Sequence, residues 1–394
     1  MVKDLYNSRL PTNQLTIPKA EKYKEAALNV RRLYDSGVPF FTKDGIRRMA
    51  SLLETAKRSD EKALVVGLDG HTVEVSMRGG KIIPTPGQFK NKNDKMEIET
   101  VLEDRIRYVP INTLTHLDDD KHYFPLTFIS TFALRDRTSK AMPVHDPRLV
   151  RLPLHATPQN FERERALFEG GAQATELRSV LESYGRSNRL PTVKKVVAFA
   201  CGSISRRDRH GAVALRQHAL ILFVRDYFAE RQKSEVQCFS QEPGYWGADF
   251  EMLQDAAVGI KVLEDPWGFI EVDDETVVLS FAPNVPVRQI VADLARPALM
   301  FWNRGWHAAA HDTQGLDPSL SIVPSNSTDP MAPRLGNLLK GYWEHPLTDD
   351  DDHTFLESAM YIRKPTGWVE EEAAITETCV LTLKSDEEAD NQSG

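Results

Sequence analysis

Two stretches of the chain decide its fold: VKKVVAFACGSIS at 193–205 and TVVLSFAPNVP at 276–286. Each begins with a run of β-branched and other apolar side chains, which is typical of a strand buried on both faces of a parallel sheet. Each run then passes into a short turn of small and polar residues, and a helical pattern follows. Because strands alternate with helices here, the region predicts βαβ units around a parallel sheet.

The same alternation continues on both sides of these two stretches. Further strands are expected at 235–240, 260–263 and 298–302, and helices at 212–230, 246–258 and 285–294. We therefore predict an α/β fold whose core, 160–305, is a Rossmann-like, doubly wound, mostly parallel sheet in the order 3-2-1-4-5. Within it, Trp267-Gly268-Phe269-Ile270 is interpreted as a hairpin that adds an antiparallel edge strand.

The flanking segments divide the rest of the chain. An N-terminal α+β accessory region is predicted at 19–150, with helices near 23–34 and 44–57, a hairpin at 62–77 and a strand pair at 123–134. The remaining assignments are a flexible tail at 1–18, a Pro-rich linker at 311–335, a C-terminal docking segment at 336–382 and an acidic disordered tail at 383–394.

Composition narrows the class of protein. The chain has 394 residues, 41% of them hydrophobic, with 49 Lys and Arg against 57 Asp and Glu. This balance of −8 argues against general nucleic-acid binding, and no run of about 18 apolar residues predicts a membrane span. The three cysteines, Cys201, Cys238 and Cys379, are too few and too widely spaced for a disulfide scaffold or a CxxC metal site. We expect an intracellular protein of the cytoplasm, the nucleus or both.

The predicted topology places a candidate ligand site at the carboxyl edge of the sheet. The loops after the first and fourth strands meet there, at the point where the strand order reverses, and the second strand ends beside them. A helix N-terminus after each loop favours an anionic or strongly polar ligand, and an acid after the second strand suits ribose hydroxyls. The candidate ligand-binding residues are Cys201, Gly202, Ser203, Ser205, Glu242, Pro283 and Asn284.

Simpler explanations stand beside each of these assignments. The first loop is neither GxGxxG nor GxxxxGK[ST], so it also fits a plain turn in which Ser205 begins a capping pattern with Asp208. Glu242 also fits a loop glutamate before a proline turn, and Asn284 also fits a helix cap. Cys201 has no sequence-adjacent base that would activate it as a nucleophile, and His218 lies on an apolar helical face typical of a core histidine.

Other polar clusters point to chemistry less strongly. Arg206, Arg207 and Arg209 suit a phosphate or an acidic partner, or a solvated surface. Two acidic runs next to histidines, 116–122 and 349–353, lack the spacing of a known cation site, so no metal site is predicted. No catalytic residue is identified.

Several segments together carry a resemblance to a known family. They are Leu33-Tyr34-Asp35-Ser36-Gly37-Val38-Pro39-Phe40, Val196-Val197-Ala198-Phe199-Ala200-Cys201-Gly202-Ser203, Arg216-Gln217-His218-Ala219-Leu220, Gln241-Glu242-Pro243 and Phe281-Ala282-Pro283-Asn284. Their order and spacing over about 165–305 resemble the sensitivity-to-red-light-reduced (SRR-like) domain, and in particular its fungal branch.

The resemblance implies regulation rather than a defined reaction. Members are linked to red-light and circadian signalling in plants and to haem metabolism in animals. Many of them carry Met-Pro-His-Cys where this chain has Ala282-Pro283-Asn284-Val285. The first hypothesis is therefore a regulatory or adaptor protein with protein partners, which also binds a nucleotide-like ligand. The alternative is a nucleotide- or S-adenosylmethionine-dependent transferase. The cofactor is left open, and haem is a weaker candidate than a nucleotide.

Overall fold

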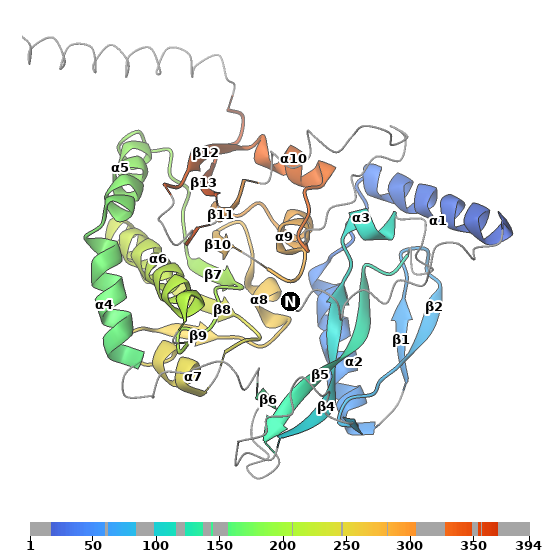
Figure 1. Cartoon of the computed structure of the whole chain (residues 1–394). Coiled ribbons are helices and arrows are strands. Elements are labelled where there is room, and N and C mark those ends of the chain that lie inside the picture. The colour runs from blue at the N-terminus through green and yellow to red at the C-terminus, as the bar shows by residue number, and fades with distance from the viewer. Residues whose placement is uncertain are drawn as a thin grey trace, which may run out of the picture.

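The computed structural model describes residues 17–59, 62–83, 98–115, 123–136, 143–144, 157–206, 208–245, 247–281, 283–304, 328–348, 354–355 and 357–368. Within them the protein is α/β, with ten helices and a seven-stranded mixed sheet (Figure 1). Most of the predicted tail 1–18, most of the predicted linker 311–335 and the whole acidic tail 383–394 lie outside the described residues. No helix in the described ranges is long and apolar enough to span a bilayer.

Five parallel strands form the centre of the large sheet. They are β7 (Lys195–Phe199), β8 (Gln237–Gln241), β9 (Ile260–Val262), β10 (Thr276–Ser280) and β11 (Leu299–Asn303). They lie in the order β9-β8-β7-β10-β11, which confirms the predicted order 3-2-1-4-5. Val196 of β7 pairs with Cys238 of β8 on one side and Val277 of β10 on the other. The loops after β7 and β10 therefore leave the sheet at its topological switch point.

Two C-terminal strands complete the sheet on the β11 side. β13 (Ser358–Arg363) pairs antiparallel with β11, and β12 (Tyr342–Pro346) pairs antiparallel with β13. The predicted hairpin at 267–270 is wrong, because these residues form the short helix α8 (Trp267–Glu271). The Gly268 N–H donates to the Gln241 side chain at 2.7 Å, and the buried ring of Phe269 stacks on Phe199, so tertiary contacts hold this turn as a helix.

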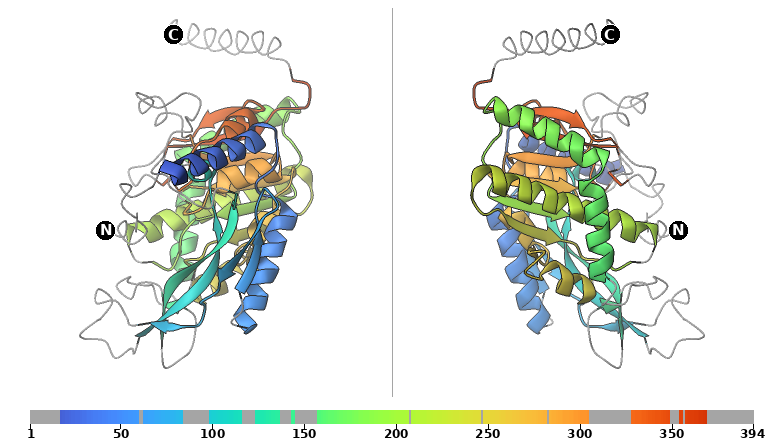
Figure 2. Two further views of the ribbon diagram at one scale, coloured as in Figure 1. Left: turned by 90° about the vertical axis from the view of Figure 1, so that its right-hand side faces the viewer. Right: turned by 90° about the vertical axis from the view of Figure 1, so that its left-hand side faces the viewer.

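Helices cover both faces of the sheet. One face is covered by α4 (Thr157–Glu169), α5 (Ala172–Arg186), α6 (Arg209–Gln232) and α7 (Gly247–Leu253). The other face is covered by α8, α9 (Val287–Leu294) and α10 (Pro333–Leu339). The side views show the first group in front on one side of the molecule and the N-terminal elements in front on the other (Figure 2). α7 is shorter than the predicted helix 246–258, because it ends at Leu253.

The N-terminal residues form helices and two further sheets, both antiparallel, one of two strands and one of four. Their elements are α1 (Ile17–Asp35), α2 (Lys43–Ser59), β1 (Lys62–Val66), β2 (Thr72–Ser76), β3 (Ile82–Ile83), β4 (Ile98–Tyr108), α3 (Ile111–Leu114), β5 (Leu126–Asp136) and β6 (Pro143–Val144). β1 and β2 form the predicted hairpin. The predicted strand pair at 123–134 is wrong, because β5 is one long strand that pairs with β4 along its length and with β6 near its end. The acidic and basic side chains spaced along β4 hide its alternation in the sequence.

The N-terminal elements pack on the α8–α10 side of the large sheet. Residues from both parts, among them Ile46 of α2 and Val278 of β10, belong to one continuous hydrophobic cluster. Arg334 of α10 reinforces this contact, since it pairs with Asp293 of α9 at 2.8 Å and lies over the ring of Tyr34 at 4.0 Å. The N-terminal elements therefore share a core with the sheet that carries the candidate site.

Candidate functional site

The loop after β7 is built on two residues with left-handed backbone. Ala200 has φ +56° and Gly202 has φ +72°, a region that glycine enters without strain. The Gly202 N–H points at Glu242, donating to its Oε2 at 3.0 Å, while the Gly244 N–H donates to Oε1 at 2.6 Å. The carboxylate at the end of β8 is thus fixed against the loop by two backbone groups. Burial raises the pKa of Glu242, and these two hydrogen bonds work against that rise.

A second carboxylate, from α7, holds the rest of this loop. Asp249 is fully buried and accepts from the Ser203 hydroxyl at 2.7 Å and from the Ser205 N–H at 2.9 Å. The hydroxyls of Ser203 and Ser205 lie 3.0 Å apart. Sequence reasoning missed Asp249. The sequence did contain an indication of its role, because Asp249 lies three and four residues before Met252 and Leu253, which are both buried. Residues at this spacing share one helical face, which indicates that the carboxylate faces the core.

The loop after β10 contains two predicted ligand-binding residues, Pro283 and Asn284. Pro283 is buried and Asn284 is exposed. The prediction that Asn284 caps the next helix is wrong, because Pro286 is the N-cap of α9 and no side chain caps it. Instead, the Arg288 N–H in the first turn of α9 faces both oxygens of the Asp329 carboxylate at 3.2 Å. Burial raises the pKa of Asp329 to about 6, and Arg288 opposes that rise.

The N-terminus of α6 is also occupied from within the chain. The prediction that Ser205 caps this helix is wrong, since Asp208 is the N-cap and accepts from the Gly211 N–H. Arg206 pairs with the same carboxylate, with Nε 2.9 Å from Oδ1. Hence part of the predicted basic cluster is neutralised by its own neighbour, while Arg207 lies outside the described residues. Both helix N-termini at this edge of the sheet already face a carboxylate of the protein itself.

The nucleophile and base candidates nearest the loop are buried and occupied. The Cys201 thiol is 2% exposed, and burial with the nearby Glu242 charge raises its pKa. His218 is fully buried, which lowers its pKa to about 4. Its Nδ1 lies 2.6 Å from the carbonyl oxygen of Ala214 and its Nε2 lies 2.5 Å from the Tyr245 hydroxyl.

These contacts determine which atoms of His218, Tyr245 and Ser240 carry the hydrogen-bonding protons. A carbonyl oxygen only accepts, so Nδ1 of His218 carries the ring proton and Nε2 accepts from Tyr245. The Tyr245 oxygen in turn lies 2.6 Å from the Ser240 hydroxyl, which donates to it. No lone pair of His218 remains for proton transfer, and the thiol of Cys201 stays protonated near neutral pH. The arrangement supports a rigid core beneath the loop rather than a nucleophile and its base.

The remaining predicted residues are placed as follows. The first loop, Glu242 and Asp249 come together, whereas in the described part of the chain no hydrogen bond or ion pair joins them to Asn284. A cavity beside α5 and another beside α9 are both lined by residues other than the seven predicted ligand residues. The acidic runs at 116–122 and 349–353 lie outside the described residues, and within those residues no group of three His, Cys, Asp or Glu side chains could hold a metal ion.

The fold and this edge define the class of protein. It is an α/β protein with a mixed seven-stranded sheet. The carboxylates of Glu242 and Asp249 hold the loop after β7, and that of Asp329 holds the first turn of α9. The SRR1 domain family matches residues 174–362, so this part of the chain is an SRR1 domain and the predicted SRR-like family is confirmed. The match runs from α5 to β13 and therefore includes all seven strands of the large sheet. No curated protein matches the chain.

Proposed function

We propose that this SRR1-type protein is a regulatory or adaptor protein that acts through protein partners rather than by catalysis. The observation that carries the proposal is the closed switch point. The Gly202 N–H is bonded to Glu242 and the Ser205 N–H to Asp249, so two groups that would bind a phosphate already have partners inside the chain. A loop whose N–H groups are bonded within the chain supports the fold and does not bind a phosphate.

The chemistry beneath the loop supports the same proposal. An enzyme that uses a nucleophile needs a lowered pKa or an adjacent base to activate it. Here burial raises the pKa of the Cys201 thiol, and both ring nitrogens of His218 are hydrogen-bonded. A regulatory role in signalling, such as circadian or haem-linked control, requires none of these groups to react.

A ligand at this edge would be a nucleoside rather than a nucleotide held by its phosphates. Glu242 is partly exposed, and its two backbone hydrogen bonds use two of the roughly four lone-pair positions of a carboxylate. The others are free to accept from ribose hydroxyls, which is a role that acids after the second strand serve in nucleotide-binding sheets. The negative charge of Glu242 disfavours a phosphate close to the loop.

The architecture of the proposal is a doubly wound, Rossmann-like core with an N-terminal accessory region, joined to a Pro-rich linker, a C-terminal docking segment and an acidic tail. Residues 336–363 support the docking assignment, since they supply the last four residues of α10 and the whole of β12 and β13. We place the protein in the cytoplasm, the nucleus or both, where it meets its partners.

A ligand panel measured by thermal unfolding tests the proposal. Adenosine, ATP, S-adenosylmethionine and haem are added to the full chain in turn, and a ligand at 100-fold its Kd adds about 2.7 kcal/mol of stability. We expect adenosine to stabilise the wild type, ATP to do so less, and Glu242→Gln to abolish the effect of adenosine. Glu251→Gln, an exposed acid of α7, is the control. Turnover of ATP or of S-adenosylmethionine would instead establish the transferase and overturn the adaptor role.

A further inference from the structure

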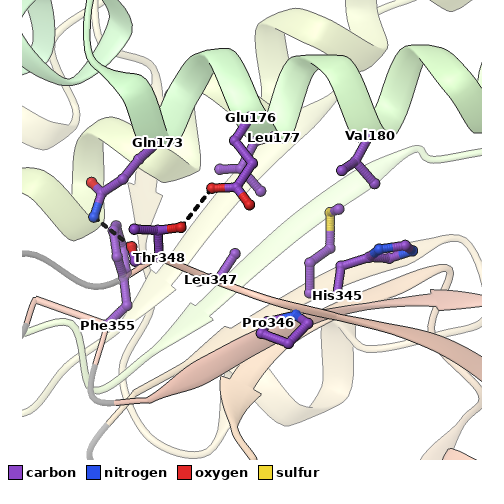
Figure 3. A pocket seen from close by; sticks show the side chains of 10 residues that line it. Gln173, Glu176, Leu177, Val180, His345, Pro346, Leu347, Thr348 and Phe355 are labelled. Atoms are coloured by element: carbon purple, nitrogen blue, oxygen red, sulfur yellow. Dashed lines mark hydrogen bonds between the residues drawn. The ribbon is translucent and has the colours of Figure 1, made fainter. Parts of the chain in front are cut away.

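A cavity lies away from the switch point, between α5 and the antiparallel strands β12 and β13. Its volume is about 110 Å³. Four side chains that point from α5 toward β12 and β13 form one wall, namely Gln173, Glu176, Leu177 and Val180 (Figure 3). The opposite wall is formed by the end of β12, the residues after it and part of β13, namely His345, Pro346, Leu347, Thr348, Phe355 and Met360.

The interior of this cavity is apolar. Leu177, Phe355 and Met360 are buried, and Val180 and Leu347 are partly buried. A cavity lined in this way has no partners for water, and a void of similar size in another protein binds benzene or xenon. The α5 cavity is therefore suited to a small hydrocarbon group.

The polar groups lie at the rim and are held in place. Thr348 joins the two walls, since its carbonyl oxygen accepts from Gln173 Nε2 at 2.7 Å and its hydroxyl donates to Glu176 Oε2 at 2.7 Å. On the other side, His345 Nε2 lies 3.0 Å from the Tyr184 hydroxyl. Burial lowers the pKa of His345, so the imidazole is neutral near pH 7.

One charged oxygen at this rim is open to a ligand. Glu176 Oε1 makes no hydrogen bond or ion pair within the part of the chain that the structure describes, and the Glu176 side chain is exposed. An apolar cavity with a carboxylate held at its rim is complementary to a hydrocarbon group that ends in a cation. An anion would be repelled there, and a neutral molecule would gain no charge attraction to the carboxylate.

We propose that the α5 cavity binds a small primary amine, with a branched or cyclic hydrocarbon group of about four to six carbons inside and the ammonium at Glu176. The size of the group follows from the volume of the cavity, and the ammonium follows from the carboxylate. Such an amine carries its proton at neutral pH, because its pKa lies near that of lysine at about 10.4.

Met360 provides a direct readout of binding. The full chain is labelled with 13C at its methionine methyl groups, and the signal of Met360 is assigned with Met360→Leu. We expect isobutylamine to shift the Met360 signal in a saturable way and to leave that of Met49, in the other hydrophobic cluster, unchanged. The uncharged isobutanol should bind more weakly, and 1-naphthylmethylamine, which is too large for the cavity, should not shift the signal.

Two variants separate the parts of the proposal. Glu176→Gln should weaken isobutylamine by about two- to fivefold, the range of an exposed ion pair, and leave isobutanol unchanged. Glu182→Gln on the same helix is the matched control. Val180→Phe fills the cavity and should abolish the shift for both probes.

Three results would overturn the proposal: a Met360 signal that isobutylamine does not move, an affinity for the amine that Glu176→Gln leaves intact, or binding that persists in folded Val180→Phe. If Val180→Phe does not fold, the comparison of the amine with the alcohol in Glu176→Gln still decides.

Discussion

Asp249 is the side chain on which the switch-point loop depends most, so Asp249→Ala is the sharpest test of the site. Its carboxylate is fully buried and accepts from the Ser203 hydroxyl at 2.7 Å and the Ser205 N–H at 2.9 Å. The alanine variant leaves two buried donors without this acceptor, at about 1–3 kcal/mol each. It also removes a buried charge, which offsets part of that cost. We expect the free energy of unfolding to fall by about 3 kcal/mol.

Asp249→Asn tests the same reasoning from the other side. The amide oxygen still accepts from the Ser205 N–H, and the Ser203 hydroxyl turns to accept from the amide nitrogen. The expected loss is therefore smaller, about 1 kcal/mol. Urea unfolding of the full chain, followed by tryptophan fluorescence, gives both values, and Glu251→Ala on the exposed side of α7 should stay within about 0.5 kcal/mol of the wild type. An Asp249→Ala protein as stable as that control would refute the role of Asp249.

Three further changes test buried contacts, two of them beside Gln241 of β8 and one between the N-terminal elements and the large sheet. Burial raises the pKa of Asp265 from 3.8 to about 6, so the folded protein binds the proton of this carboxyl more tightly than the unfolded chain does. The free energy of unfolding, relative to that of Asp265→Asn, should therefore rise by roughly 2–3 kcal/mol as the pH falls from 7 to 4. Urea unfolding at each pH measures it. Arg334→Ala removes the cation that pairs with Asp293, whose side chain is 6% exposed. The free energy of unfolding should fall by about 3 kcal/mol, measured by thermal unfolding, and by less in Arg334→Lys. Equal losses in the two variants would contradict a role for the charge. Gly268→Ala places a Cβ 2.7 Å from a glutamine oxygen of β8 and should cost about 1–3 kcal/mol, whereas Gly336→Ala, with no atom within 4 Å, should be tolerated.

The strand order of this protein is typical of ligand-binding sheets, but the backbone N–H groups at the switch point are already hydrogen-bonded to carboxylates of the protein itself. The order β9-β8-β7-β10-β11 brings the two loops to one edge. Yet Glu242, Asp249 and Asp329 occupy backbone N–H groups that a phosphate would use. Topology places a crevice, but the side chains that enter it decide whether an anion binds.

The strand order was predictable because it depends on local patterns and on one general rule. Short apolar runs such as those at 195–199 and 276–280 can only be buried on both faces, and right-handed crossovers then leave few arrangements. The turn at Gly202 was likewise visible in the sequence, since a single glycine follows a buried strand and adopts φ +72°. The helix at 267–271 was not, because its two stabilising contacts come from residues of β7 and β8.

The amino-acid sequence by itself determined the α/β class, the order of the five parallel strands and the family of the domain, because period, turn residues and motif order are local properties of the chain. The tertiary structure alone decided the partners of the loop. Asp249 lies 44 residues from Ser205 and Asp329 lies 41 from Arg288. A carboxylate reaches a backbone N–H at that separation only after the strands between them are paired, and no local pattern records the encounter.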